Sequence, residues 1–227
     1  FLFKSLKMKC VHCKSLCIKK GFQKNGKQKY RCSDCRKYQQ ANYTYKAYEV
    51  DLNAHITKLV NRSCGIRDIA YIKDISTTTV MRRILSIANK VTAPSSFPLF
   101  GDYEMDEMHT YIRKDNRKTE TYIAYAINKQ TKQVVNFTVG SRSAETLAQT
   151  VDKILLNYPK SIRTDKWSAY PCIIPEKIHI CTRRKINQIE RYNYTLRTHL
   201  KRLGYNRLCQ SKTVEMLVAC LKIYFWS

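Results

Sequence analysis

Acidic residues are scarce in this chain of 227 residues. It has 17 Asp and Glu against 42 Lys and Arg, which leaves a formal net charge of +25. Such an excess attracts polyanions, because neutralising their phosphates releases bound counterions. Nucleic acid is therefore the expected partner. The alternative is a ribosomal protein, or a basic protein that binds other molecules non-specifically. The basic residues are spread along the chain and not gathered on one amphipathic helix, which argues against a membrane surface as partner.

The chain also lacks a long apolar run. No segment approaches the roughly 18 apolar residues of a membrane-spanning helix. Residues 1–7 contain only four apolar residues, too few for the apolar region of a signal peptide. The ten cysteines are therefore expected to be reduced thiols of a cytoplasmic protein, not the disulfide framework of a secreted one. Whether the natural start is Phe1 or Met8 stays open.

Four of the cysteines form two CxxC pairs separated by 18 residues: Cys10, Cys13, Cys32 and Cys35. Two such pairs can offer four thiolates to one ion, which is typical of structural zinc. We therefore predict a zinc ribbon over residues 8–44, in which the metal supplies much of the folding energy. A redox-active CxxC is the weaker interpretation, because no thioredoxin-like pattern surrounds it. His12 and Cys17 are expected to be bystanders.

Residues 45–91 contain no proline and carry the apolar periodicity of helices. A short helix, a turn and a second helix capped by Ser76 predict a helix-turn-helix domain over these residues. The side chains expected to face DNA are Thr77, Thr78, Arg82 and Arg83. A plain helical hairpin with solvated charges is the alternative. Residues 92–102 hold two Pro, two Ser and a Gly, and are predicted to be a linker.

The pattern after the linker is mixed α/β, and residues 103–227 are predicted to form one domain. We expect three strands, a helix, two short strands and two helices: 103–113, 121–128, 133–139, 144–158, 161–164, 177–180, 188–203 and about 213–225. This order is the one expected of a ribonuclease-H-like fold, by analogy of topology. The first strand and the strand after the first helix would then lie side by side at the centre of the sheet.

The few acids of this half are candidates for divalent-metal chemistry. Asp106 lies in the first strand, Asp165 ends a later strand, and Glu190 begins a helix, so the three could hold two Mg²⁺ or Mn²⁺ ions about 3.5–4 Å apart. Each alone could instead be an ion pair or a helix cap. Strand alternation places Glu104 on the Asp106 face and Glu107 on the opposite face, away from the site. Arg197, two helical turns after Glu190, could hold the DNA backbone.

Three stretches carry a family resemblance: EMDE at 104–107, TDKWSAY at 164–170 and QIERYNYTLRTHLKRLGY at 188–205. With the zinc ribbon and helix-turn-helix patterns before them, they resemble the insertion sequence one family of transposases, from Cys10 to about Glu215. The resemblance implies a DDE transposase with Asp106, Asp165 and Glu190 as its catalytic acids. It also implies binding to the ends of an insertion sequence, followed by two-metal strand cleavage and strand transfer.

The implied partners are double-stranded DNA, as transposon end and as target, and further copies of the chain assembled on that DNA. The implied location is the nucleoid of a prokaryotic cytoplasm. Two departures from the family stand out. The chain is continuous, whereas many members divide the two halves between overlapping reading frames, and the end after Lys222 (IYFWS) is short or divergent.

Three alternatives remain beside the transposase. One is a zinc-ribbon and helix-turn-helix regulator without catalysis, in which the three acids would lie apart in space. Another is an inactive transposase copy. The third is a different metal nuclease, such as a junction resolvase, which would share the acids without rejoining strands. Convergence of the Asp106, Asp165 and Glu190 carboxylates is the observation that separates the first alternative from the others.

Overall fold

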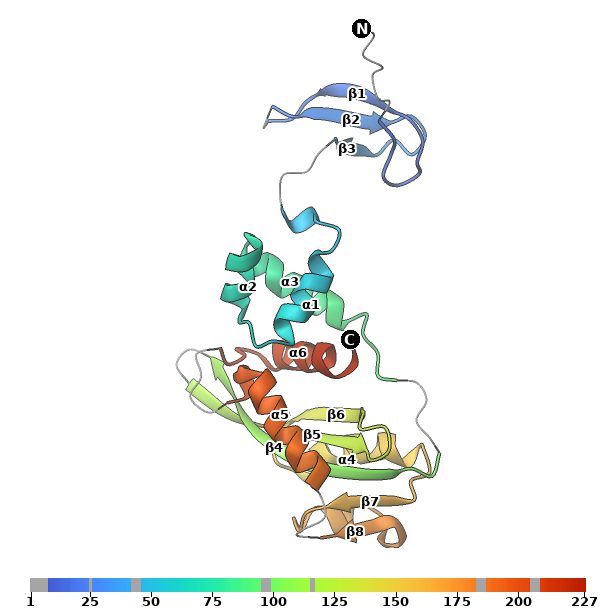
Figure 1. Ribbon diagram of the computed structural model, residues 1–227, viewed down its shortest axis with the longest axis vertical. Coiled ribbons are helices and arrows are strands. Elements are labelled where there is room, and N and C mark those ends of the chain that lie inside the picture. Colours follow the sequence, from blue (N-terminus) through green and yellow to red (C-terminus); the bar gives the residue numbers. More distant parts are fainter. Residues whose placement is uncertain are drawn as a thin grey trace. The chain divides into compact units, whose positions relative to one another are not determined.

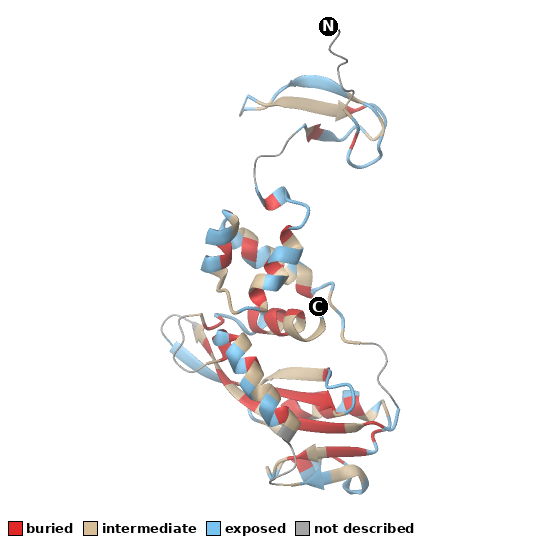
Figure 2. Cartoon of the chain, in the orientation of Figure 1, coloured by how far each residue is buried: buried red, intermediate tan, exposed pale blue. Residues whose placement is uncertain are grey.

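A computed structural model of the chain describes residues 8–24, 26–41, 46–94, 99–114, 117–182, 187–204 and 209–227. The chain divides into two compact units, Phe1–Glu49 and Val50–Ser227. Figure 1 labels their elements, and Figure 2 shows that buried residues concentrate in the sheet and helices of the second unit. In the part of the chain that the structure describes, no helix is both long and apolar enough to cross a membrane.

The first unit is a small antiparallel sheet. Its strands are β1 (Cys17–Phe22), β2 (Gln28–Cys32) and β3 (Tyr38–Gln40), followed by the short 3-10 helix η1 (Lys46–Tyr48). Gly26 has a φ of 74° in the β1–β2 connection, a backbone conformation that glycine adopts without strain. Apart from Cys10, Cys32 and Ala47, no described apolar residue of this unit is buried. A unit with so little core depends on another source of folding energy.

The second unit is built on a five-stranded mixed sheet. Its strands are β4 (Asp102–Lys114), β5 (Arg117–Asn128), β6 (Val134–Gly140), β7 (Ser161–Thr164) and β8 (His179–Cys181), in the order β6-β5-β4-β7-β8. β4, β5 and β6 are antiparallel neighbours, whereas β7 runs parallel to β4 and to β8. The predicted pairing of the first strand with the strand after the helix, at the centre of the sheet, is thus confirmed.

Helices cover both faces of this sheet. α4 (Ala144–Leu155) packs on one face, while α5 (Asn187–His199) and α6 (Val214–Trp226) pack on the other. Alternation along β4 explains the two layers, because Met105 points to the α4 side and Met108 to the α5 side. α5 is shorter than predicted: Leu200 leaves the helical region (φ −119°, ψ 79°), and the 3-10 helix η4 (Lys201–Leu203) follows. Two further 3-10 helices are η2 (Tyr170–Cys172) and η3 (Glu176–Ile178).

Three helices precede the sheet: α1 (Leu52–Val60), α2 (Ile66–Lys73) and α3 (Thr77–Ala88). Ser76 caps α3 as predicted, since its side chain accepts a hydrogen bond from the Thr79 backbone N–H at 3.2 Å. α1 and α3 pack against α6, so these helices and the sheet share one compact unit (Figure 1). The boundaries predicted for the three domains and the linker stay predictions.

Candidate active site

Three acids converge at the end of β7. Ligand oxygens of Asp106, Glu107 and Asp165 lie within 4.8 Å of one another. Two of the three predicted acids are therefore close together, and the third member of this cluster is Glu107. Hard carboxylate oxygens at this separation suit a divalent cation such as Mg²⁺ or Mn²⁺.

The register of two parallel strands creates this cluster. Glu104 of β4 pairs with Arg163 of β7, so Asp165, two residues after Arg163, follows the last residue of β7 beside Asp106. The prediction that Glu107 lies away from the site is wrong, although its assignment to the opposite face holds. Among the described residues, no strand pairs with this edge of β4 beyond Thr164, so side chains from both faces can reach Asp165. Strand alternation alone could not have shown this, because it ignores where the neighbouring strand ends.

Asp106 is held from α5. Asn193 donates a hydrogen bond from Nδ2 to Asp106 Oδ2 at 2.7 Å, and the Tyr125 hydroxyl donates to Asn193 Oδ1 at 2.7 Å. Burial, helped by the charges of Asp165 and Glu190 and opposed by hydrogen bonds from Glu107 N and Asn193, raises the pKa of Asp106 to about 6. A carboxyl this costly to ionise gains from a nearby cation.

Glu107 is held from the other face of the sheet. The hydroxyl of the buried Tyr170 donates a hydrogen bond to Glu107 Oε1. Burial raises the pKa of Glu107 to about 7, with the charges of Asp106 and Asp165 acting in the same direction. Glu107 therefore has the same electrostatic character as Asp106 and contributes to the site.

A cation lies next to this acid. The positive charge of Arg142 lowers the pKa of Glu107, opposing the larger effect of burial. The Arg142 guanidinium stacks over the Trp167 ring at 4.7 Å from its centroid, and the Trp167 backbone N–H donates to Asp165 Oδ1 at 2.9 Å. No sequence motif points to Arg142, because it stands far from the acidic stretches in the chain.

Glu104 has a structural role at the start of α5. Its side chain is 1% exposed, pairs with Lys129 Nζ at 3.3 Å, and accepts hydrogen bonds from the backbone N–H groups of Gln188 and Ile189 at 3.2 and 3.0 Å. A carboxylate at a helix N-terminus satisfies free N–H groups and the helix dipole. The beginning of α5 is therefore tied to β4.

Glu190 lies in the first turn of α5, directly after Gln188 and Ile189. Its side chain is exposed and lies outside the 4.8 Å cluster, yet its charge raises the pKa of Asp106. Glu190 and Asn193 are three residues apart and so share a side of the helix. Arg197, further along α5, is exposed and donates from Nη2 to the backbone oxygen of His109 at 3.1 Å.

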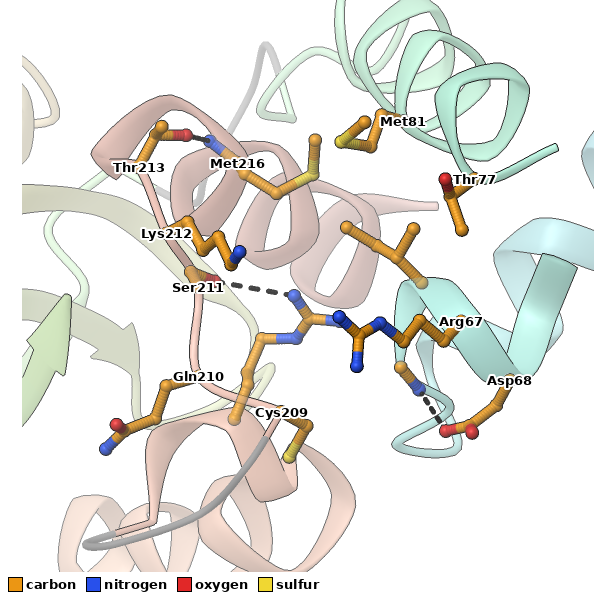
Figure 3. A pocket seen from close by; sticks show the side chains of 13 residues that line it. Arg67, Asp68, Thr77, Met81, Cys209, Gln210, Ser211, Lys212, Thr213 and Met216 are labelled. Atoms are coloured by element: carbon orange, nitrogen blue, oxygen red, sulfur yellow. Dashed lines mark hydrogen bonds between the residues drawn. The ribbon is translucent and has the colours of Figure 1, made fainter. Parts of the chain in front are cut away.

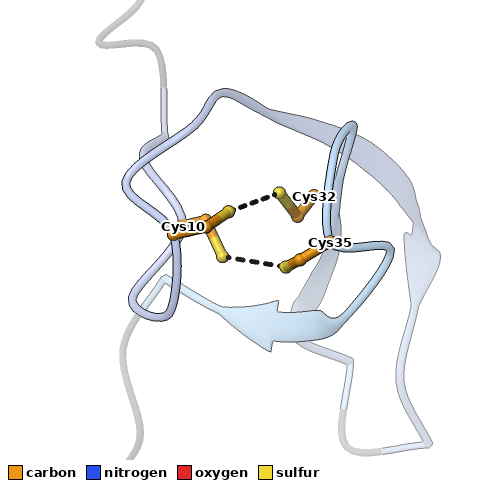
Figure 4. Close-up of side chains that lie close together, drawn as sticks. Cys10, Cys32 and Cys35 are labelled. Carbon is orange, nitrogen blue, oxygen red and sulfur yellow. Dashed lines mark hydrogen bonds between the residues drawn. The ribbon is translucent and has the colours of Figure 1, made fainter.

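The four predicted zinc ligands converge in the first unit. Their sulfur atoms lie within 4.8 Å of one another: Cys10, Cys13, Cys32 and Cys35. Figure 4 labels three of them, Cys10, Cys32 and Cys35. The residue after each CxxC pair, Lys14 or Arg36, has a positive φ, of 64° and 57°, so both loops turn back at the same point. His12 and Cys17 lie outside this four-sulfur cluster.

Two sets of hydrogen bonds make the cysteine cluster suitable for binding a metal ion. Hydrogen bonds from Ser15 lower the pKa of Cys13 to about 6, which favours its thiolate. A hydrogen bond from Lys37 N lowers the pKa of Cys35, but burial and hydrogen bonds with the other three thiols outweigh it, so that the pKa of Cys35 is raised. The buried Gln39 accepts a hydrogen bond from Val11 N at 2.9 Å and donates one to Lys9 O at 2.8 Å, which fixes the first loop to β3. Four thiolates are a donor set that could bind zinc.

The residues predicted to face DNA lie on the first two turns of α3. Thr77, Thr78 and Arg82 are exposed, and Arg83 is half-buried. They are accessible on one unit together with the acidic cluster, whereas the cysteine cluster belongs to the other unit.

Comparison with known proteins identifies the sheet-bearing part of the second unit. The family model described as "IS1 transposase" matches residues 102–225, more than half of the chain. The chain is 36% identical over 114 residues to "Insertion element IS1 4 protein InsB" of Escherichia coli K12, a match that spans 50% of this chain and 66% of that relative. It is 35% identical over 114 residues to "Insertion element IS1 protein InsB" of Shigella sonnei, spanning 85% of that protein. The chain therefore belongs to the IS1 transposase family.

Proposed function

We propose that the chain is a DNA transposase that binds the ends of an insertion sequence and cleaves and transfers DNA strands with two divalent cations. The observation that carries this proposal is the convergence of the Asp106, Glu107 and Asp165 carboxylates within 4.8 Å in a chain of net charge +25. A basic chain attracts DNA, and a local acidic cluster within it attracts the cations that phosphoryl transfer needs. Family membership supports the same activity.

The catalytic domain is proposed to be ribonuclease-H-like, which the five-stranded mixed sheet and its strand order support. Asp106, Asp165 and Glu190 are the proposed catalytic acids, and Glu107 joins them as a fourth ligand. Mg²⁺ or Mn²⁺ bound there would supply a charge that stabilises both the attacking and the leaving oxygen of the phosphodiester. Asn193 orients the Asp106 carboxylate, and Tyr170 orients that of Glu107.

Glu190 keeps its proposed role because the start of α5 is fixed. The contacts of Glu104 with the N-terminus of α5 and of Asn193 with Asp106 place the first turns of this helix beside the cluster. We propose that the exposed Glu190 side chain reaches a cation there by a change of rotamer. The regulator alternative required the acids to lie apart, and the closeness of Asp106 to Asp165 counts against it.

DNA recognition is assigned to the first three helices and the zinc ribbon. α2, a turn at 74–76 and α3 have the element order of a helix-turn-helix, and the accessible Thr77, Thr78, Arg82 and Arg83 are its proposed DNA contacts. Arg197 and Arg142, both exposed, are proposed to hold the DNA backbone near the acids. Zinc at the four cysteines would hold the first unit in shape. Assembly into oligomers on DNA belongs to the same proposal.

The test is strand cleavage and strand transfer on end-containing DNA with Mn²⁺. Asp106→Asn, Asp165→Asn and Glu190→Gln should each lower both steps at least 100-fold, since an amide keeps the shape but removes the charge that holds the cation. DNA affinity should stay within about two-fold. Glu107→Gln should also lower the rate, and exposed Glu176→Gln is the matched control. Full strand transfer by Asp165→Asn or Glu190→Gln would end the two-metal assignment.

A further inference from the structure

A cavity of about 490 Å³ lies in the second unit, built from residues other than those of the acidic cluster. Its lining comes from the start of α2, the start of α3, the region around η4 and the segment leading into α6 (Figure 3). Among its lining residues are Arg67, Arg202 and Lys212 as bases and Asp68 as the one acid. The lining therefore carries an excess of two positive charges.

One of these bases is buried. Arg202 is only 5% exposed, and its Nη1 donates one long hydrogen bond, at 3.4 Å, to Ser211 Oγ. Among the residues that the structure describes, no carboxylate lies within ion-pair distance of Arg202. A buried guanidinium without a counter-charge is unfavourable unless an anion joins it. Exposed Arg67 points into the same cavity in Figure 3.

Three helices begin at this cavity. Gly65 precedes α2, Thr77 is the first residue of α3, and Thr213 caps α6 by accepting a hydrogen bond from Met216 N at 3.2 Å. All three residues line the cavity. A helix N-terminus carries a partial positive charge, and these three add to the charge of the arginines. Asp68 offsets part of it and already accepts a hydrogen bond from Gly65 N at 2.9 Å.

We propose that this cavity binds a phosphate group. Planar guanidinium groups such as those of Arg67 and Arg202 match phosphate oxygens, and Lys212 adds a mobile charge. The source that the position favours is a phosphodiester of DNA, because Thr77 begins the helix proposed to contact DNA. That choice of source rests on the proposed function, whereas phosphate binding itself does not. A DNA strand held there would bridge α3 and the sheet-bearing part of the unit through α6.

The first measurement is thermal unfolding of the full chain in orthophosphate against chloride of equal ionic strength. Binding at ten times the dissociation constant should raise Tm by roughly 3 °C. Arg67→Ala with Lys212→Ala should remove this rise, and both residues are exposed, so the fold should tolerate the change. Lys58→Ala with Arg62→Ala makes the same change of charge at exposed residues outside the cavity and should keep the rise. Loss of the rise in both double variants, or in neither, overturns the proposal.

The second measurement separates the two sources of phosphate. For a DNA duplex, Arg67→Ala with Lys212→Ala should lower the binding affinity about tenfold at moderate salt. The slope of log affinity against log salt concentration should become less steep by about one to two. Loss of the orthophosphate effect with unchanged DNA binding would support the phosphate site and assign it to a small free phosphate. An orthophosphate effect in a wild-type chain that binds no DNA would support the site while refuting the proposed DNA binding.

Discussion

Replacing Glu107 by Gln should stabilise the metal-free chain at alkaline pH. Burial raises the pKa of Glu107 from 4.5 to about 7. Below pH 4.5 the carboxyl is protonated in both the folded and the unfolded chain, so burial costs nothing; above pH 7 it is ionised in both, and the full penalty applies. Stability therefore falls as pH rises through this window, which is the opposite of a salt-bridged carboxylate.

The magnitude follows from that change in pKa. A rise from 4.5 to about 7 corresponds to about 3 kcal/mol, which partial solvent screening reduces to about 1–2 kcal/mol. Gln keeps the oxygen that accepts the Tyr170 hydrogen bond and removes the charge. In urea unfolding without Mg²⁺ or Mn²⁺, Glu107→Gln should gain that free energy at pH 8 and little at pH 4.5.

Two comparisons make this experiment decisive. Exposed Glu176→Gln should change the unfolding free energy by less than about 0.5 kcal/mol at either pH. Added Mn²⁺ should stabilise the wild type at pH 8 more than Glu107→Gln, because the cation replaces the charge that burial leaves uncompensated. Equal effects of Glu107→Gln at pH 4.5 and pH 8 would refute the reasoning.

Three further predictions concern other parts of the chain. The zinc-loaded protein should contain about one zinc by atomic emission, and Cys13→Ser should lose it; a wild-type chain that keeps its fold without metal would contradict this. Gly140→Ala should cost about 1–2 kcal/mol in thermal unfolding, since a Cβ there would lie 2.8 Å from Thr146 Oγ1; an unchanged Tm would refute the clash. Phe225→Ala should cost about 2 kcal/mol, as its ring stacks on Tyr125 at 6.0 Å; a smaller loss than that of an exposed Tyr194→Ala would contradict it.

The secondary structure of the second unit was predictable because its signals are local. Short runs rich in apolar and aromatic residues indicated β4 and β5, and the cap at Ser76 indicated the start of α3. The pairing of β4 with β7 followed from topology. The apolar residues after Lys222, which looked divergent in sequence, belong to α6, and Trp226 Nε1 donates to Val134 O at 2.9 Å. That role depends on β6 and could not be inferred from the chain end alone.

The site was only partly predictable, because its remaining members depend on where elements end and meet. Asp106 and Asp165 stood out as acids in or after strands. Glu107 was discounted by the correct rule of alternation, since the rule does not include the end of β7. Asn193 and Arg142 meet the acids only through packing of α5 and through the connection before α4. The phosphate cavity likewise requires α6 to lie against α3, which no local pattern encodes.

The net positive charge of the chain and the burial of the acidic cluster have opposite effects on the pKa of its carboxyl groups. Burial has the larger effect, because most of the positive charges are distant. The +25 charge of the chain should lower the pKa of every carboxyl, but charges more than about 8 Å away are largely screened at physiological salt. Burial acts locally and without screening, and it raises the pKa of Asp106 to about 6 and that of Glu107 to about 7. The basic surface can therefore attract DNA without neutralising the acids. The buried acids are in turn stabilised in their ionised form by a nearby positive charge, which under the proposed function a divalent cation supplies.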